Sequence, residues 1–272
     1  MNAENSGNYE GITYEGIAVR RHGDHIAEIV LDRPDALNAL NTAMAESIAA
    51  ACTGLGKDPS VRAVVLSAAG TKAFCAGADL KERNAMTDAQ ILRQREVFRK
   101  AFGGVRDLPQ PTVAAVHGYA LGGGCEFAMS CDIIVADETA VFGLPEVTVG
   151  LVPGGGGTQL ALRRLGAGLA ADLVLTGRRV TIGEAERIGL VARRVPAGRA
   201  RDTAMDVAAA IANNSPVAVR AAKRALRNGW GVTLDSALDI EDAAWRTAAS
   251  SADRREGIAA FAEKRAPRWP GE

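Results

Sequence analysis

The chain has 272 residues, of which 47% are hydrophobic, so it can bury a sizeable core as one large domain or as a domain with an appendage. Its 32 Lys and Arg residues balance 32 Asp and Glu residues, which argues against a dedicated nucleic-acid or membrane-surface protein. A net charge near zero weakly favours self-association. No uncharged apolar run reaches about 18 residues, so we expect no membrane span.

Metal and disulfide chemistry are not expected. The four cysteines form no CxxC pair, and the three histidines have no HExxH or similar ligand spacing. So few cysteines in a chain of this length favour a reducing compartment. Residues 1–11 lack the basic and apolar regions of a secretory signal, so we expect a cytoplasmic protein.

The chain begins with a predicted pair of strands, residues 16–20 and 26–31, joined by a turn at residues 22–24. A helix is expected next, with Thr42 as its N-cap. Its apolar positions repeat on one face, at Met44, Ile48, Cys52 and Leu55.

Alternation of strands and helices continues through the first half. Residues 61–67 form a mostly apolar strand, as in parallel sheets, and a glycine-containing loop follows. Residues 88–105 have helical character, and residues 112–116 read as another strand. This order indicates βαβ units and a largely parallel arrangement.

After Gly157 the pattern becomes mainly helical. Residues 158–176 read as two helical pieces, and Thr181 with Glu184 resembles a capping box. Residues 190–195 form a short predicted strand. We therefore divide the chain into a core, residues 1–195, and a helical C-terminal region, residues 196–272, which is a candidate for oligomerisation or for a lid.

Residues 112–157 carry the strongest functional signal. A strand leads into GGGCE, where a short helix is expected to begin with Glu126 in its first turn. Backbone N–H groups at a helix start lack intrahelical partners, and glycine lets a ligand approach them closely. Such a site suits an anion or a carbonyl oxygen that becomes one. Tight packing of a strand–helix turn would also require glycine.

Two acids flank this turn. Glu126 and Glu146 each lie in an apolar stretch, and burial of an unpaired carboxylate is costly. Each acid alone has a structural explanation, because acids favour the first turn of a helix. Together they indicate a general acid/base pair with shifted pKa values, and hence an enzyme.

Other catalytic signatures are absent. No GxxxxGK[ST] phosphate loop, no GxGxxG after the first strand and no GxSxG elbow occurs. Cys125 lies beside Glu126, but no histidine has a matching context, so we expect a core thiol.

Three motifs carry a family resemblance: AFCAGADLKE, GYALGGGCEFAMSCDIIVAD and FGLPEVTVGLVPGGGGTQ. Their order and spacing resemble the crotonase family, specifically the enoyl-CoA hydratases, from about Val19 to Arg265. The resemblance implies an α/β fold, a crotonase-like spiral of ββα units with a helical C-terminal region. It also implies assembly as trimers or dimers of trimers, a role in fatty acid and lipid metabolism, and no cofactor other than the coenzyme A of the substrate.

The resemblance also implies roles for individual residues. The backbone N–H groups of Ala78 and Gly123 would hold the thioester oxygen. Glu126 would orient and deprotonate the water that attacks C3, and Glu146 would deliver or remove the proton at C2. The expected coenzyme A contacts are Ala76, Asp79, Leu80, Lys81, Phe261 and Lys264. A solvated charge is an equal alternative for Lys81 and the favoured one for Lys264.

Alternatives remain at this stage. KERNAM, within the segment that would line the acyl end, resembles the methylglutaconyl-CoA hydratase branch, and LPE resembles the carnitinyl-CoA dehydratase branch. An enoyl-CoA isomerase and a non-catalytic binder of CoA thioesters or RNA are further possibilities. Retention of both glutamates favours hydration, and the balanced charge disfavours RNA.

Overall fold

The strands form two main sheets, and the strands between residues 63 and 143 are added to the two sheets alternately. The computed structural model describes residues 8–9 and 12–272, so most of the N-terminal stretch considered above lies outside the described residues. The six-stranded sheet has the order β12-β9-β7-β5-β4-β3, and the four-stranded sheet has the order β11-β10-β8-β6. The larger sheet comprises Ile17–His22 (β3), Ile26–Leu31 (β4), Ala63–Ala68 (β5), Thr112–Val116 (β7), Ile133–Asp137 (β9) and Arg193–Val195 (β12).

The smaller sheet comprises Ala73–Cys75 (β6), Tyr119–Leu121 (β8), Val141–Gly143 (β10) and Arg179–Thr181 (β11). A separate antiparallel pair joins Asn8–Tyr9 (β1) to Ile12–Thr13 (β2). Within the two main sheets the β3–β4 and β10–β11 pairings are antiparallel, and the others are parallel. The expected parallel arrangement is therefore confirmed.

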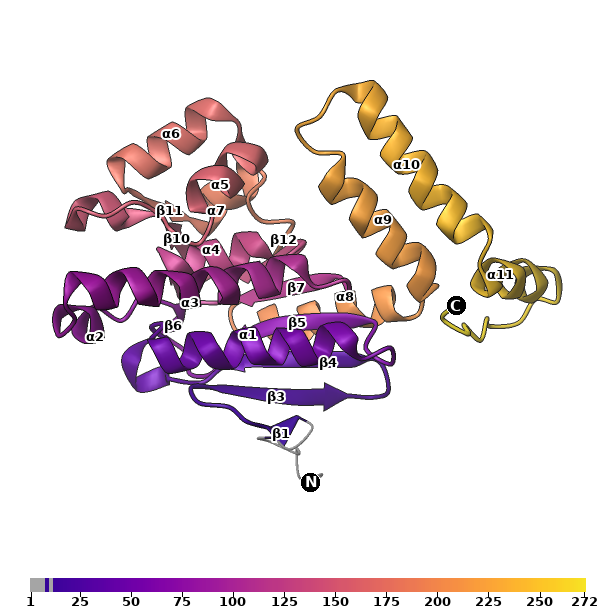
Figure 1. Ribbon diagram of the computed structural model, residues 1–272, viewed down its shortest axis with the longest axis horizontal. Helices are drawn as coiled ribbons and strands as arrows, with labels where there is room; N and C mark the ends of the chain where they lie inside the picture. The colour runs from indigo at the N-terminus through magenta and orange to yellow at the C-terminus, as the bar shows by residue number, and fades with distance from the viewer. Residues whose placement is uncertain (1–7, 10–11) are drawn as a thin grey trace.

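Helices connect and cover these strands (Figure 1). They are Thr42–Lys57 (α1), Leu80–Asn84 (α2), Asp88–Asp107 (α3), Gly123–Ser130 (α4), Gly157–Leu165 (α5), Ala167–Thr176 (α6), Ile182–Arg187 (α7), Ala200–Ala212 (α8), Pro216–Asn228 (α9), Leu234–Ala249 (α10) and Ala252–Ala262 (α11), with 3-10 turns Pro34–Ala36 (η1) and Pro145–Val149 (η2).

The connections make a spiral. In the pairs β5–β6, β7–β8 and β9–β10, the first strand joins the larger sheet and the second joins the smaller sheet before a helix follows. This repetition confirms the expected spiral of ββα units. Because β6, β8 and β10 are parallel neighbours, the three loops that follow them leave the same edge of the small sheet.

Small residues allow α8 to pack closely on the larger sheet. Alanines and Val207 of α8 are buried against Val65, Val113 and Val135 of the sheet. The other face of that sheet belongs to the main core, which includes α1, α3 and α4. The first helix after residue 195 is thus part of the packed body, whereas α9 and α10 form a hairpin that stands to one side of it (Figure 1).

A buried asparagine shapes the loop that leads toward the site. Asn38 has a left-handed backbone, and its Nδ2 donates to the carbonyl oxygens of Ala69 and Ala73, each at 2.9 Å. Beyond it, the Leu40 N–H donates to the Gly77 oxygen at 2.8 Å, and the Asp79 N–H donates to the Leu40 oxygen at 2.9 Å. The loop after β6 is therefore held on both sides of Ala78.

Two local predictions are wrong. The N-cap of α1 is Asn41, whose side chain accepts from Met44 N, and Thr42 is the first helical residue. Thr181 is the N-cap residue of α7, as expected, but its side chain makes no cap hydrogen bond, and the Glu184 carboxylate binds the Arg178 guanidinium at 2.7 and 3.0 Å, so the expected capping box does not form. The observed capping box lies at the start of α3, between Thr87 and Gln90.

Neither a membrane-spanning helix nor a metal-binding cluster is found among the described residues. No helix in residues 8–9 and 12–272 is long and apolar enough to cross a membrane. In the same part of the chain no group of three or more His, Cys, Asp or Glu side chains lies close enough to hold a metal ion.

Candidate active site

A cavity of about 260 Å³ lies where the loops after β6, β8 and β10 meet α3 and the glycine loop before α5. Its polar walls bring together both predicted acids and both predicted oxyanion donors. The apolar walls include Leu40, Ile91, Phe98, Phe102, Leu151 and Val152. Concave sites with few convergent polar groups are the usual location of small-molecule binding.

Two backbone N–H groups in this cavity have no acceptor. Leu40 and Ala78 form a parallel bridge in which the residues flanking Ala78 make the hydrogen bonds, so the Ala78 N–H points away from Leu40. Gly123 is the first residue of α4, where an N–H has no intrahelical partner. Among the described residues neither N–H donates a hydrogen bond. The pair can therefore receive an external oxygen.

Glu126 is held by main-chain donors. Its side chain is buried, and Oε1 accepts from Gly155 N at 2.6 Å and from Gly157 N at 2.7 Å. Burial raises the pKa of this carboxyl, and these two N–H groups with Arg95 and Arg83 partly oppose the rise. One oxygen is thus fixed while the other stays available, as a proton acceptor requires.

Glu146 lies on the opposite wall, at the start of η2 after β10. Desolvation raises its pKa to about 7, and the neighbouring Glu126 charge adds to the rise. In the described part of the chain its buried Oε2 has no hydrogen-bond partner. The Glu146 carboxyl can therefore carry a proton near neutral pH and present it to a ligand.

Glycine is required at two positions beside these acids. Gly122 has a φ of +52°, and a Cβ there would lie 3.2 Å from Glu146 Oε1. A Cβ on Gly157 would lie 2.9 Å from Glu126 Oε1. The glycines therefore permit close approach of backbone and carboxylate.

Two arginines that the sequence analysis did not single out also line the cavity, Arg83 on α2 and Arg95 on α3. Both lie in charged helical segments, where a solvated face is the ordinary expectation. Arg95 follows the buried Gln94, and only that interruption of the polar pattern could have indicated an inward position.

The predicted coenzyme A contacts divide into two groups. Ala76 and Leu80 line the cavity. Asp79 instead caps α2 and pairs with Arg33 Nη2 at 3.0 Å, and Lys81 is exposed. Within this single chain, Phe261 is 87% exposed on α11 and Lys264 follows that helix, and neither lines the cavity.

The cysteine beside Glu126 is inert. Cys125 is buried, and desolvation raises its pKa to about 12, so a thiolate nucleophile is not available near neutral pH. The expectation of a core thiol is confirmed. All four cysteines are free and buried.

Together, a ββα spiral and a cavity with two vacant N–H donors and two carboxyls of raised pKa define a crotonase-fold protein. The Enoyl-CoA hydratase/isomerase family matches residues 21–272, and the chain belongs to that family. The identification by resemblance is thereby confirmed.

Curated relatives and solved structures agree in their names. The short-chain-enoyl-CoA hydratase of Clostridium acetobutylicum is 40% identical over 240 residues, which cover 88% of this chain and 92% of that protein. The mitochondrial enoyl-CoA hydratase domain-containing protein 2 of Homo sapiens is 40% identical over 251 residues, covering 91% and 86%. A crystal structure of enoyl-CoA hydratase from Bacillus anthracis superposes with a TM-score of 0.92 at 41% identity and covers 95% of this chain and 100% of that one.

The raised pKa of Glu146 predicts a pH-dependent stability. Between its ordinary value of 4.5 and about 7, the folded chain keeps a proton that the unfolded chain releases, so stability falls as pH rises through this window. Glu146→Gln removes the titration. We expect its melting temperature to exceed that of the wild type at about pH 8 and to converge with it at about pH 4, measured by calorimetry. Glu46→Gln, at an exposed position of α1, is the control, and a variant less stable than wild type at the higher pH would contradict the expectation.

Proposed function

We propose that this chain is an enoyl-CoA hydratase, a hydro-lyase that reversibly adds water in syn fashion across the 2,3 double bond of a 2-enoyl-CoA thioester. The observation that carries the proposal is the meeting of two unpaired N–H groups and two carboxyls of raised pKa in one cavity. The enoyl-CoA hydratase names of relatives at about 40% identity support it. Coenzyme A enters as part of the substrate, so the reaction requires no separate cofactor.

The N–H groups of Ala78 and Gly123 receive the thioester oxygen. When water adds at C3, negative charge moves onto that oxygen, and donors already in position stabilise it without reorganisation. One such donor typically contributes about 10²–10³ in rate. The main-chain fixation of the Ala78 loop by Leu40 supplies the required rigidity.

Glu126 acts as the base and Glu146 as the acid in the hydration direction. The free oxygen of Glu126 takes a proton from water as the water oxygen attacks C3, and Glu146 gives its proton to C2. In dehydration each carboxyl performs the reverse transfer. A double-bond isomerase needs only one proton carrier, so the two carboxyls favour hydration over isomerisation. The four free, buried cysteines support a reducing, cytoplasmic setting.

Substitution of either acid tests the reaction. Purified protein should consume a 2-enoyl-CoA, measured as loss of the absorbance of the conjugated thioester. Glu126→Gln and Glu146→Gln should each lower kcat by about 10²–10⁴, because each removes one proton transfer. Glutamine can still accept from Gly155 and Gly157, so folding should be retained, as checked by circular dichroism. Wild-type turnover in either variant would refute the assignment.

Gly122→Ala tests the geometry of the turn. The added Cβ meets Glu146 Oε1 and is strained at positive φ, so we expect the Gly123 N–H and the Glu146 carboxyl to shift and kcat to fall at least about tenfold. Gly23→Ala is the matched control: it has a similar φ of +58°, but its Cβ meets nothing within 4 Å. That variant should lose stability while keeping kcat. Equal kcat in both variants would show that the turn does not position the site.

The helical C-terminal region supports self-association. Several large apolar side chains of the α9–α10 hairpin are exposed, namely Leu226, Trp230, Leu234, Leu238 and Trp245, around a groove of about 580 Å³. Contiguous exposed apolar surface of this kind marks an interface. We expect a trimer or a dimer of trimers, with residues 196–272 as the oligomerisation region. Light scattering should give a mass of three or six chains, and a monomeric mass would contradict the assembly.

A further inference from the structure

Arg95 places a buried donor in the catalytic cavity without a partner. Its Nη1 is inaccessible to solvent, and among the described residues it donates to no carboxylate or carbonyl oxygen. A guanidinium stays protonated, so an unpaired buried N–H cannot be relieved by loss of the proton. Leaving such a donor unsatisfied carries the full desolvation penalty of a charged group. A ligand atom is the natural acceptor.

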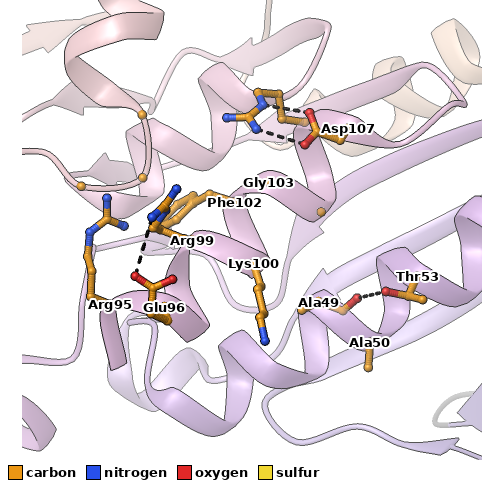
Figure 2. A pocket seen from close by; sticks show the side chains of 15 residues that line it. Ala49, Ala50, Thr53, Arg95, Glu96, Arg99, Lys100, Phe102, Gly103 and Asp107 are labelled. Carbon is orange, nitrogen blue, oxygen red and sulfur yellow. Dashed lines mark hydrogen bonds and ion pairs between the residues drawn. The ribbon is translucent and has the colours of Figure 1, made fainter. Parts of the chain in front are cut away.

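The position of Arg95 is fixed by the glycine loop. A Cβ on Gly154 would lie 3.6 Å from Arg95 Cζ, so the guanidinium packs directly against this residue. The next residue, Gly155, donates its N–H to Glu126. Arg95 also lines a neighbouring pocket between α1 and α3, and in Figure 2, which shows that pocket, no dashed line joins Arg95 to another residue drawn, whereas Arg99, one turn further along α3, is joined to Glu96. Arg95 is therefore held beside the Glu126 loop rather than on the solvated face of α3.

Arg83 supplies a second cation to the same cavity. Its Nε donates to Gln94 Oε1 at 3.0 Å, and its Cζ lies 5.2 Å from the centre of the Phe98 ring. Among the described residues its terminal nitrogens have no hydrogen-bond partner. The stem is thus anchored, and the part of the guanidinium that binds carboxylates bidentately remains available.

The two glutamates do not neutralise this pair. Both arginines influence the pKa of Glu126, and Arg83 influences that of Glu146. No ion pair joins either arginine to either glutamate within the part of the chain that the structure describes. The Glu82 carboxylate is the strongest charge acting on Arg83, ahead of Glu126 and Glu146, so the pair is not a net positive charge. What the cavity leaves unmet is the hydrogen bonding of Arg95 Nη1 and of the terminal nitrogens of Arg83.

We propose that Arg83 and Arg95 select an acyl group that ends in a carboxylate, so that the substrate is a short 2-enoyl-CoA with an anionic distal end. The inference rests on the proposed hydration at the same site. Ala78 and Gly123 fix the thioester end, Glu126 and Glu146 flank C3 and C2, and both arginines line the same cavity, with Arg95 beside the loop that binds Glu126. A cavity of about 260 Å³ suits a short chain. The bound carboxylate satisfies Arg95 Nη1 and accepts from the free terminal nitrogens of Arg83.

Binding of unreactive thioesters tests this selection without turnover. The probes are 4-carboxybutanoyl-CoA and its uncharged isostere 5-methylhexanoyl-CoA, each titrated calorimetrically into wild-type protein. We expect the carboxylate to bind at least about tenfold more tightly, the effect of one well-placed charged hydrogen-bonding pair. Arg95→Gln should abolish most of this ratio, and Arg95→Lys should retain part of it because the charge remains. Arg99→Gln, on the same helix but paired with Glu96, should leave the ratio unchanged.

Turnover of the corresponding 2-enoyl-CoA pair provides the second measurement. The ratio of kcat/KM for 4-carboxybut-2-enoyl-CoA to that for 5-methylhex-2-enoyl-CoA should exceed about ten in the wild type and approach one in Arg95→Gln. The ratio cancels any effect that the variant has through Glu126, because such an effect changes the turnover of both substrates equally. Equal binding of the two saturated thioesters, or a ratio that Arg95→Gln leaves intact, would overturn the selection. Absence of turnover with tight, arginine-dependent binding would instead refute the hydratase assignment alone.

Discussion

The pairing of β8 with β6 on one side and with β10 on the other is the constraint on which the site depends. Each of these strands has three residues, and each is followed at once by a functional loop. Since the strands are parallel, Ala78, Gly123 and Glu146 meet although up to 68 positions separate them in sequence (146 − 78). The larger sheet forms the body of the fold, and the smaller sheet aligns the three loops that form the site.

Burial raises the pKa of both acids and hydrogen bonding lowers it, and the balance of the two effects differs between Glu126 and Glu146. For Glu126, two N–H groups and two nearby guanidinium groups offset part of the desolvation, whereas the Oε2 of Glu146 lacks a partner. Two identical side chains are thereby suited to opposite ends of a proton transfer. The arginines participate in this balance even before a substrate arrives, which links the choice of acyl group to the readiness of the base.

Much of this arrangement could be predicted from sequence, because it depends on local signals. The GGGCE turn identifies a helix start, and the acids stand out because Glu126 and Glu146 interrupt apolar stretches. The sequence pattern does not predict strands β6, β8, β10 and β11, since three residues are too few to show a hydrophobic period. The expected capping box of Thr181 and Glu184 does not form, because Arg178, three residues before Thr181, binds the Glu184 carboxylate. Arg83 and Arg95 could not be assigned to the site from sequence, because the side of a helix on which a charged residue meets solvent or a cavity depends on the neighbouring elements.

The proposed oxyanion site is made of main chain, and this has an evolutionary consequence. A side-chain donor can be deleted by any single substitution, but the N–H of Ala78 or Gly123 survives every replacement except proline. Mutational drift can therefore exchange the carboxyls and the arginines, and so alter which bond is made and which acyl group is accepted, while the place that stabilises an enolate persists. A scaffold with this property can diversify in reaction type and in substrate without having to reinvent its central chemical step.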